Sequence, residues 1–222
     1  MNNDPQPSIS RSEDTVRRLR SDIFLGAFAP GTLLAEASVA RQMGVSRVPV
    51  REALFALERE GLVEFSPTGR AYVKELTPHD FEELFVLRLA LEPPGARLAA
   101  PRIRTEFRAL EANIEATVIA RSLPEVTHLD LDFHQIILDA SGQKRLARLW
   151  GSLRSELELW LERMHQTHEF QTQGTREKTV ESHRELLICF KEQSPEEAER
   201  HMQLHIQGWR AWLPMASEAR EI

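Results

Sequence analysis

The chain has 222 residues, a formal net charge of −6 and a single cysteine, Cys189. This length allows one large domain or two modest ones, each able to bury a core. Because 34 acidic residues outnumber 28 lysines and arginines, a generally polyanion-binding protein is excluded and any nucleic-acid surface must be local. One cysteine excludes an intrachain disulfide, and no stretch resembles a secretory signal or a membrane span. We therefore expect a soluble, cytoplasmic protein.

The first third of the chain predicts short helices followed by a hairpin. Residues 1–10 are polar and are expected to form a disordered tail. Apolar spacing predicts three helices, over about residues 13–27, 36–43 and 47–60. Two apolar runs on either side of a Ser-Pro-Thr-Gly turn predict two short strands, over residues 62–65 and 71–73.

The third of these helices carries the residues that indicate a function. Ser46 stands at its N-cap, where the hydroxyl can accept a backbone hydrogen bond, and Pro49 falls in the first turn, where a missing N–H costs nothing. Arg47 and Arg51 are one turn apart on an outward face. Arginines at this place can bond a guanine edge bidentately or clamp phosphates. The alternative is a solvated face on an ordinary amphipathic helix.

A longer series of residues favours DNA binding. It comprises Ile23, Gly26, Pro30-Gly31, Leu34, Glu36, Val39-Ala40, Met43 to Arg47, Pro49 to Leu54, Leu57 and Glu60 to Val63. This series resembles the winged helix-turn-helix of the GntR family of bacterial transcription regulators. The resemblance implies DNA contacts from Ser46, Arg47, Val48, Pro49, Arg51, Gly69 and Arg70. For the last two, which stand at the wing, an ordinary hairpin turn is the alternative.

After Thr77-Pro78 the periodicity is helical almost throughout. Six helices are predicted, over about residues 78–99, 102–120, 124–141, 143–164, 174–192 and 195–213. Pro93-Pro94 is expected to kink or break the first of them, and Pro101 to end it. The predicted fold is mostly α, with a winged helix-turn-helix domain over residues 11–76 and an all-α C-terminal bundle of about six helices over residues 77–222.

Helical spacing puts four polar side chains on apolar faces of this bundle. His183 falls among Val180, Leu186, Leu187 and Phe190, and His205 among Ala198, Met202, Trp209 and Trp212. Asp130 and His134 are four residues apart beside Phe133. Because an unpaired buried polar group is costly, the cheapest arrangement is for these four to meet. One aspartate and three histidines suit Zn²⁺ or a similar divalent ion, whereas each histidine alone is more often a hydrogen-bonded core residue.

Two arginines also lie on apolar faces. Arg88 needs an anion, which is Glu92, Asp130 or the carboxylate of a bound metabolite. Arg154, which is close to Trp150 and two leucines, is a second case of the same kind. Both are candidate contacts for an effector.

The motif from Arg88 to Glu92, with Ala96, Leu98 to Ala100, Asp130, Phe133-His134, His183 and His205, resembles the FCD effector domain of the FadR branch of GntR regulators, in its shorter VanR-like form. The resemblance implies that Asp130, His134, His183 and His205 bind a divalent metal. Zn²⁺ is the first candidate and Ni²⁺ or Mn²⁺ the alternatives. It also implies that Arg88 contacts a small carboxylic-acid effector. The expected protein is a homodimeric, metabolite-responsive repressor that binds double-stranded operator DNA.

Two other functions stay open at the level of the sequence. An Asp/His site could hold an activated water in a metal-dependent enzyme, although no further base or nucleophile motif accompanies it and the DNA-binding segment argues against an enzyme. The C-terminal bundle could also be a purely structural dimerisation domain with hydrogen-bonded core histidines. We expect a regulator and not an enzyme.

Overall fold

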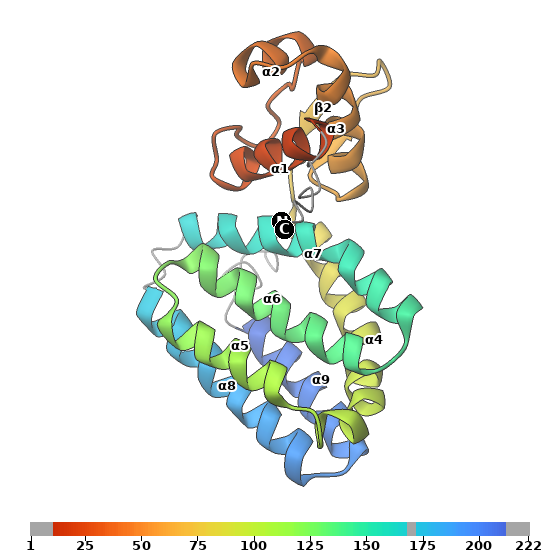
Figure 1. Cartoon of the computed structure of the whole chain (residues 1–222), viewed down its shortest axis with the longest axis vertical. Coiled ribbons are helices and arrows are strands. Elements are labelled where there is room, and N and C mark those ends of the chain that lie inside the picture. The colour runs from red at the N-terminus through yellow and green to blue at the C-terminus, as the bar shows by residue number, and fades with distance from the viewer. Residues whose placement is uncertain (1–10, 168–171, 212–222) are drawn as a thin grey trace, which may run out of the picture. The chain divides into compact units, whose positions relative to one another are not determined.

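The computed structural model describes residues 11–167 and 172–211, and within them the side chains of residues 12–161 and 174–208. The predicted tail over residues 1–10 and the side chains of Trp209 and Trp212 lie outside this part. The chain divides into two compact units with a boundary between Leu76 and Thr77 (Figure 1). The predicted fold class is confirmed, since the first unit holds a small winged helix-turn-helix and the second is all helical.

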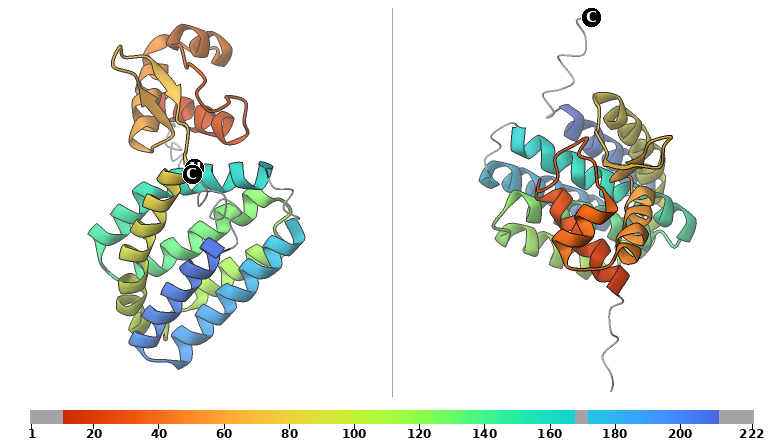
Figure 2. Two further views of the ribbon diagram at one scale, coloured as in Figure 1. Left: turned by 180° about the vertical axis from the view of Figure 1, so that it is seen from behind. Right: turned by 90° about the horizontal axis from the view of Figure 1, so that it is seen from above.

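The first unit has the order α1, α2, α3, β1, β2. These elements span Arg11–Phe24, Glu36–Met43, Arg47–Arg59, Val63–Phe65 and Ala71–Val73. The two strands pair antiparallel, with Val63 opposite Val73 and Phe65 opposite Ala71, and form the wing (Figure 2). Leu19 of α1 and Leu54 of α3 are buried in the core of this unit, so one face of α3 is packed and the other is left outside.

The turn between α2 and α3 is set by one glycine. Gly44 has φ 69° and ψ 32°, a left-handed conformation that favours glycine, and it ends α2 at the predicted place. Ser46 occupies the N-cap of α3 with an extended backbone, as expected. Its hydroxyl, however, makes no capping hydrogen bond, so the expectation of a side-chain cap is wrong. The hydroxyl of Ser46 is therefore not used by the helix itself.

The second unit consists of α4 to α9 in the part of the chain that the structure describes. They span Pro78–Ile103, Arg108–Ile119, Leu123–Ala140, Lys144–Thr167, Thr172–Glu192 and Pro195–Ala211. Helix α6 contacts α4, α5, α7 and α8, and α9 lies along α4 (Figures 1 and 2). The central helix α6 is the one that carries Asp130 and His134. None of the described helices has the length and apolar character needed to cross a membrane.

Helix α4 differs from its prediction. It runs without a break through Pro93, Pro94 and Pro101 and ends at Ile103. A capping box at its start, in which Thr77 and Asp80 exchange side-chain and backbone hydrogen bonds, fixes its first turn. Contacts with α6, α7, α8 and α9 hold the rest in place. Tertiary packing thus offsets the hydrogen bonds that the three prolines cannot donate.

Gly95 follows these prolines and lies where two helices meet α4 closely. A Cβ at this position would clash with Leu138 Cδ2 of α6 and approach Leu146 Cδ2 of α7 to 3.3 Å. By contrast, a Cβ at Gly151 in α7 would have Gln135 Oε1 as its nearest neighbour, at 3.4 Å, on an exposed surface. The two helical glycines therefore have different reasons to be present, and only the first is required by packing.

We predict opposite effects of alanine at these two positions. Gly151→Ala should raise the free energy of unfolding by about 0.5–1 kcal/mol, because alanine is the better helix former. Gly95→Ala should lower it by about 1 kcal/mol, since overpacking costs about 1–3 kcal/mol and exceeds the same helix-propensity gain. Urea unfolding followed by tryptophan fluorescence measures both values. Equal stabilisation by the two substitutions would contradict the close packing at Gly95.

Candidate metal centre

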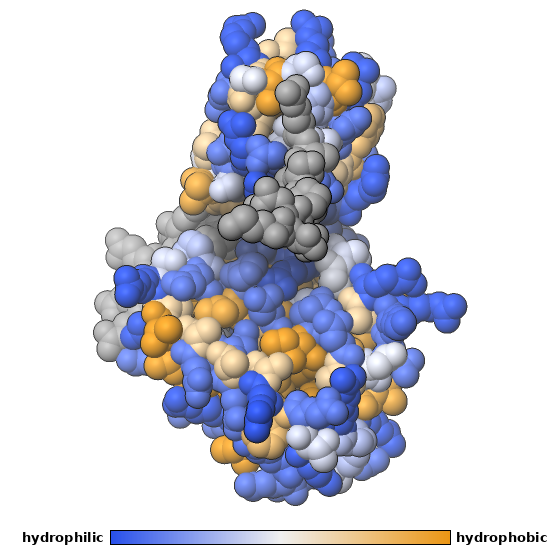
Figure 3. Space-filling model, viewed as in Figure 1, coloured by the Kyte–Doolittle hydropathy of each residue, from blue (hydrophilic) through white to orange (hydrophobic). Residues whose placement is uncertain are grey.

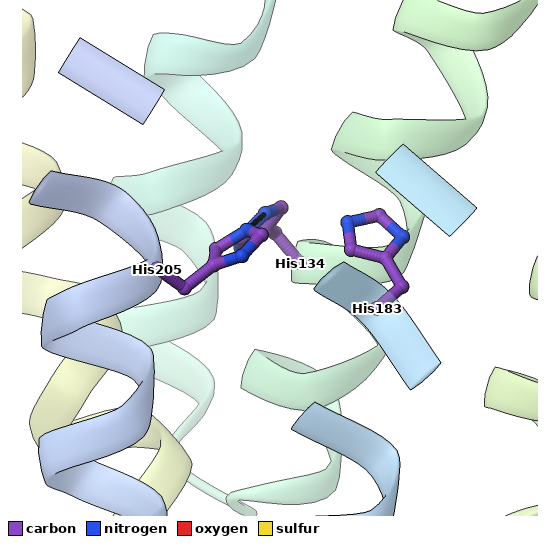
Figure 4. A group of neighbouring side chains, drawn as sticks. All are labelled: His134, His183 and His205. Carbon is purple, nitrogen blue, oxygen red and sulfur yellow. Dashed lines mark hydrogen bonds between the residues drawn. The ribbon is translucent and has the colours of Figure 1, made fainter. Parts of the chain in front are cut away.

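Three histidines from three helices point into one place in the C-terminal unit (Figure 4). His134 belongs to α6, His183 to α8 and His205 to α9. Each offers a ring nitrogen, and the three nitrogens lie within 4.8 Å of one another. The Nε2 atoms of His134 and His205 are 3.2 Å apart. His134 and His183 are buried and His205 is partly buried, so the cluster is largely shielded from water.

Asp130 joins this cluster from the turn of α6 that precedes His134. Its Oδ1 lies 3.2 Å from Nε2 of His183, and its side chain is 14% exposed. Three of the four predicted ligands therefore form one cluster, and Asp130 contacts it through His183. Phe133 stacks on the His183 ring with centroids 3.8 Å apart and fixes its orientation. Three imidazoles and one carboxylate are a donor set that suits a divalent transition metal.

His183 has an unusual environment for a core histidine. Both of its ring nitrogens are buried and make no aligned hydrogen bond, although the carboxylate of Asp130 is close. Buried polar atoms in folded proteins are nearly always hydrogen-bonded. Asp130 is thus the polar side chain close to Nε2 of His183, and Nδ1 has no hydrogen-bond partner among the described residues.

Burial and the neighbouring groups together favour the protonation states that a metal needs. Burial lowers the pKa of His183, against the opposing hydrogen bond and charge of Asp130. Burial also lowers the pKa of His205 well below its usual value, and the neighbouring histidines add to the effect. For Asp130, burial would raise the pKa, but the His183 hydrogen bond and nearby positive charges outweigh it and the pKa is lowered. Neutral imidazoles beside an ionised carboxylate are the ligand forms that bind cations.

Glu92 of α4 is a further member of the site. Its Oε2 is 2.6 Å from Nδ1 of His134, and its Oε1 accepts hydrogen bonds from Nε of Arg88 at 2.6 Å and Nε1 of Trp150 at 2.7 Å. Burial would raise its pKa, but the charges of Arg88 and His134 hold it far below the usual carboxyl range. The carboxylate contacts one side of the His134 ring and leaves Nε2 facing the cluster.

Arg88 pairs with Glu92, the first of the three anions that the sequence suggests for it. The Arg88–Glu92 pair is 1% exposed at both side chains. Burial would lower the pKa of Arg88, but the charge of Glu92 outweighs it and the pKa is raised. Nη2 of Arg88 also lies 3.2 Å from Nε2 of His134, so the guanidinium borders the histidine cluster. Sequence reasoning named Glu92 for Arg88 but missed its contact with His134, which joins residues of two different helices.

Arg154 is placed elsewhere. Its Nη1 forms an ion pair with Oδ1 of Asp132 at 2.6 Å, and its Nη2 lies 3.3 Å from Nδ1 of His128. Both partners are on α6, and neither belongs to the histidine cluster. Its described contacts therefore give Arg154 a role in joining α6 to α7, and not in the site that the sequence predicts for it.

A cavity opens beside the cluster between α8 and α9. It has a volume of about 380 Å³ and is lined by Asp130 and His205 together with residues that include Ser182 and His201. Cavities of this size are typical for small-molecule ligands. The cavity therefore gives a compact molecule access to Asp130 and His205.

The residues predicted to contact DNA are exposed or partly exposed on the first unit. Ser46, Arg47, Val48 and Arg51 are exposed and Pro49 is partly exposed at the start of α3, and Gly69 and Arg70 are exposed at the tip of the wing. Val48 is 67% exposed. The helix and the wing thus present them on accessible surface.

Comparisons with known families agree with this architecture. Residues 11–73 match the model described as bacterial regulatory proteins, gntR family, and residues 83–208, more than half of the chain, match the FCD domain. The chain belongs to the GntR family and carries an FCD domain. This GntR protein is a transcriptional regulator. Its two domains are found in transcriptional regulators, and its relatives are transcriptional regulators and not enzymes.

Several known proteins are similar over much of their length. A helix-turn-helix-type regulator from the ttuE-ttuC' intergenic region of Agrobacterium vitis is 33% identical over 148 residues, which are 63% of this GntR protein and 86% of that one. The transcriptional repressor RspR of Escherichia coli is 29% identical over 205 residues, covering 90% and 88%. The structure of E. coli McbR/YncC shares the fold, with a TM-score of 0.72, 22% identity and coverage of 94% and 99%.

We predict that the Glu92 carboxylate stabilises the C-terminal unit of this GntR protein. Glu92→Leu should lower the free energy of unfolding by about 3–5 kcal/mol, because it leaves the buried charge of Arg88 without its partner. The double variant Arg88→Met/Glu92→Leu should recover most of this loss, since it removes both charges. All 4 tryptophans lie after Leu76, so tryptophan fluorescence in urea reports on this unit. If Glu92→Leu were as stable as the wild type, the Glu92 carboxylate would not stabilise this unit.

Proposed function

We propose that this regulator is a metabolite-responsive repressor of the FadR branch, with a VanR-like FCD domain. It binds operator DNA as a homodimer and senses a small carboxylic acid at a divalent metal ion held by Asp130, His134, His183 and His205. The observation that carries the proposal is the convergence of the three histidines, with the Asp130 carboxylate 3.2 Å from Nε2 of His183. A cation would give these buried lone pairs a partner.

The donor set fits Zn²⁺ best, because imidazole nitrogens and one carboxylate oxygen are its ordinary ligands, and Ni²⁺ or Mn²⁺ remains the alternative. A bound cation would supply positive charge that attracts a carboxylate. Glu92 keeps the His134 ring oriented through its contact with Nδ1, so that Nε2 faces the other ligands. The polar partner of a ligand histidine is expected to matter almost as much as the ligand.

The effector enters through the cavity beside Asp130 and His205. A volume of about 380 Å³ admits a small organic acid, and the guanidinium of Arg88 borders the cluster that the acid would reach. Arg88 is therefore kept as a contact of the effector carboxylate. Arg154 is left out of the proposal because it pairs with Asp132.

Exposed apolar side chains on the second unit support the proposed dimer. Large apolar side chains are exposed there, and three of them, Val86, Leu87 and Leu98, are on α4. Figure 3 shows apolar residues between hydrophilic ones on one face of this unit. Apolar surface of this kind is typical of protein–protein contacts. Two copies would bring two α3 helices to neighbouring major-groove half-sites, where Ser46, Arg47, Val48, Pro49 and Arg51 contact DNA, with Gly69 and Arg70 of the wing in support.

We propose that the protein represses transcription and that binding of the acid relieves this repression. The support for this proposal is that RspR is named a repressor, as are the gluconate operon regulators of Bacillus subtilis and Bacillus licheniformis, which are 29% and 26% identical over 164 residues. An acid can change operator affinity only if it binds one arrangement of the dimer more tightly than another.

We predict that the purified protein binds a divalent cation. Zn²⁺ added after dialysis against a chelator should raise the melting temperature, because a ligand of the folded state at about 100 times its Kd adds about 2.7 kcal/mol of stability. Asp130→Ala and His183→Ala should each lose this shift. His128→Gln is the matched control, because it removes an imidazole of α6 that lies outside the cluster. Small carboxylic acids should add a further shift only when the cation is present.

An unchanged melting temperature with Zn²⁺, Ni²⁺ and Mn²⁺, together with no metal by elemental analysis, would overturn the metal site. The regulator would then keep its DNA-binding unit and a purely structural C-terminal bundle.

We also predict that Arg51 contributes to sequence-specific binding. Selection from a library of random duplexes with the full chain should enrich an inverted repeat, since a twofold dimer reads a near-palindromic site. Arg51→Ala should weaken binding to the selected duplex by roughly 5- to 150-fold, the range of one bidentate base contact. Arg59→Ala, at an exposed arginine in the last turn of α3, is the control and should have a small effect. Unchanged affinity in Arg51→Ala would contradict the role of this residue.

A further inference from the structure

A carboxylate holds the arginine that we expect to contact DNA. Glu36, the first residue of α2, accepts two hydrogen bonds from Arg51 of α3: Nε to Oε1 at 2.7 Å and Nη2 to Oε2 at 3.0 Å. The Arg51 side chain is 63% exposed and that of Glu36 is 30% exposed. The pair therefore lies at the surface, with the carboxylate on the inner side and the arginine reaching outward.

The geometry of this pair leaves one edge of the guanidinium for another partner. Glu36 uses the edge formed by Nε and Nη2. A guanidinium has five N–H donors, and its outer end, formed by Nη1 and the second N–H of Nη2, is a separate pair of parallel donors. That pair matches the O6 and N7 acceptors of guanine in the major groove. An arginine can therefore be bonded by a carboxylate on one edge and by a base on the other.

The position of Glu36 in α2 favours an ionised carboxylate. Its side chain stands in the first turn of α2, where negative charge is favoured by the helix dipole, and the N-cap residue Ala35 makes no side-chain cap. The hydrogen bond with Arg51 lowers the pKa of Glu36 against the opposing effect of burial, and the charges of Arg51 and Arg47 lower it further. The carboxylate is thus ionised and hydrogen-bonded to Arg51.

We propose that Glu36 is a positioning residue for base recognition: it fixes Arg51 so that the Nη1/Nη2 end of the guanidinium reads a guanine. The inference rests on the proposed function, in which α3 enters the major groove, and adds the base and the residue that selects it. An unrestrained arginine side chain can swing to a phosphate, which carries no sequence information. A carboxylate that holds Nε and Nη2 restricts this motion and so favours the base over the phosphate.

Glu36 could also have the opposite effect and weaken DNA binding. A carboxylate near DNA repels phosphates, and one that occupies Arg51 could withhold it from DNA. If this effect dominated, removing the carboxylate would strengthen binding to the selected site. The sign of the change on substitution therefore decides between positioning and competition.

The test uses the full chain and the duplex selected from the random library. Affinity is measured for this duplex, for duplexes in which each guanine of a half-site is replaced in turn, and for an unselected random duplex. In Glu36→Gln and Glu36→Ala, the preference for one guanine in each half-site should fall by about fivefold or more, the lower bound for a bidentate contact. Affinity for the random duplex should not fall.

Glu52→Gln is the matched control, because it removes one negative charge from an exposed position next to Arg51. It should change affinity for all duplexes alike and leave the guanine preference intact. In the double variant Glu36→Ala/Arg51→Ala, the loss of preference should equal that of Arg51→Ala alone, since both substitutions remove the same interaction. Melting curves of each variant check that the fold is kept.

A guanine preference that survives Glu36→Ala, or tighter binding of that variant to the selected duplex, would overturn the inference while leaving the proposed function intact. Failure of the wild type to enrich any sequence would overturn the proposed function and this inference with it. A loss of preference that is equal in Glu36→Gln and Glu52→Gln would show a general charge effect and would also overturn it.

Discussion

The C-terminal unit depends on one buried carboxylate. Glu92 balances the charge of Arg88, accepts the indole N–H of Trp150 and contacts Nδ1 of His134, and so joins α4, α6 and α7 at one point. A buried guanidinium without a partner would cost several kcal/mol. Since the same carboxylate faces one nitrogen of His134, it also leaves the other nitrogen turned toward His205. Stability and the geometry of the histidine cluster therefore come from the same contacts.

In the DNA-binding unit the carboxylate of Glu36 holds Arg51, but at the surface of the protein and not in its core. The Glu36–Arg51 pair is exposed, so water and salt weaken it and it adds little to stability. The Glu92–Arg88 pair is buried, where an unbalanced charge is expensive. An exposed pair can direct a side chain and leave one of its edges open to a ligand, whereas a buried pair holds its members within the core. This difference fits a surface that meets DNA and a core that holds a site.

The surroundings of the histidines also explain how a site can be kept ready in a bundle. Phe133 stacks on His183 and Glu92 contacts His134, so two of the three rings are restrained before any ligand arrives. His205 is less buried and borders the cavity between α8 and α9. Side chains that are already restrained lose less conformational entropy when a ligand binds. The least buried ring is the one beside the opening through which an effector would pass.

Local patterns in the sequence determined the helices, the wing and the turn at Gly44, because spacing, capping and left-handed glycine are properties of neighbouring residues. They also determined that Asp130, His134, His183 and His205 would lie on buried faces, since helical periodicity alone fixes which side a residue takes. Only the tertiary structure decided that α4 continues through Pro93 and Pro94, because contacts with other helices offset the missing hydrogen bonds. It alone also decided that Glu92 meets His134 and Glu36 meets Arg51, since these pairs depend on how two helices pack and no spacing along one chain encodes that distance.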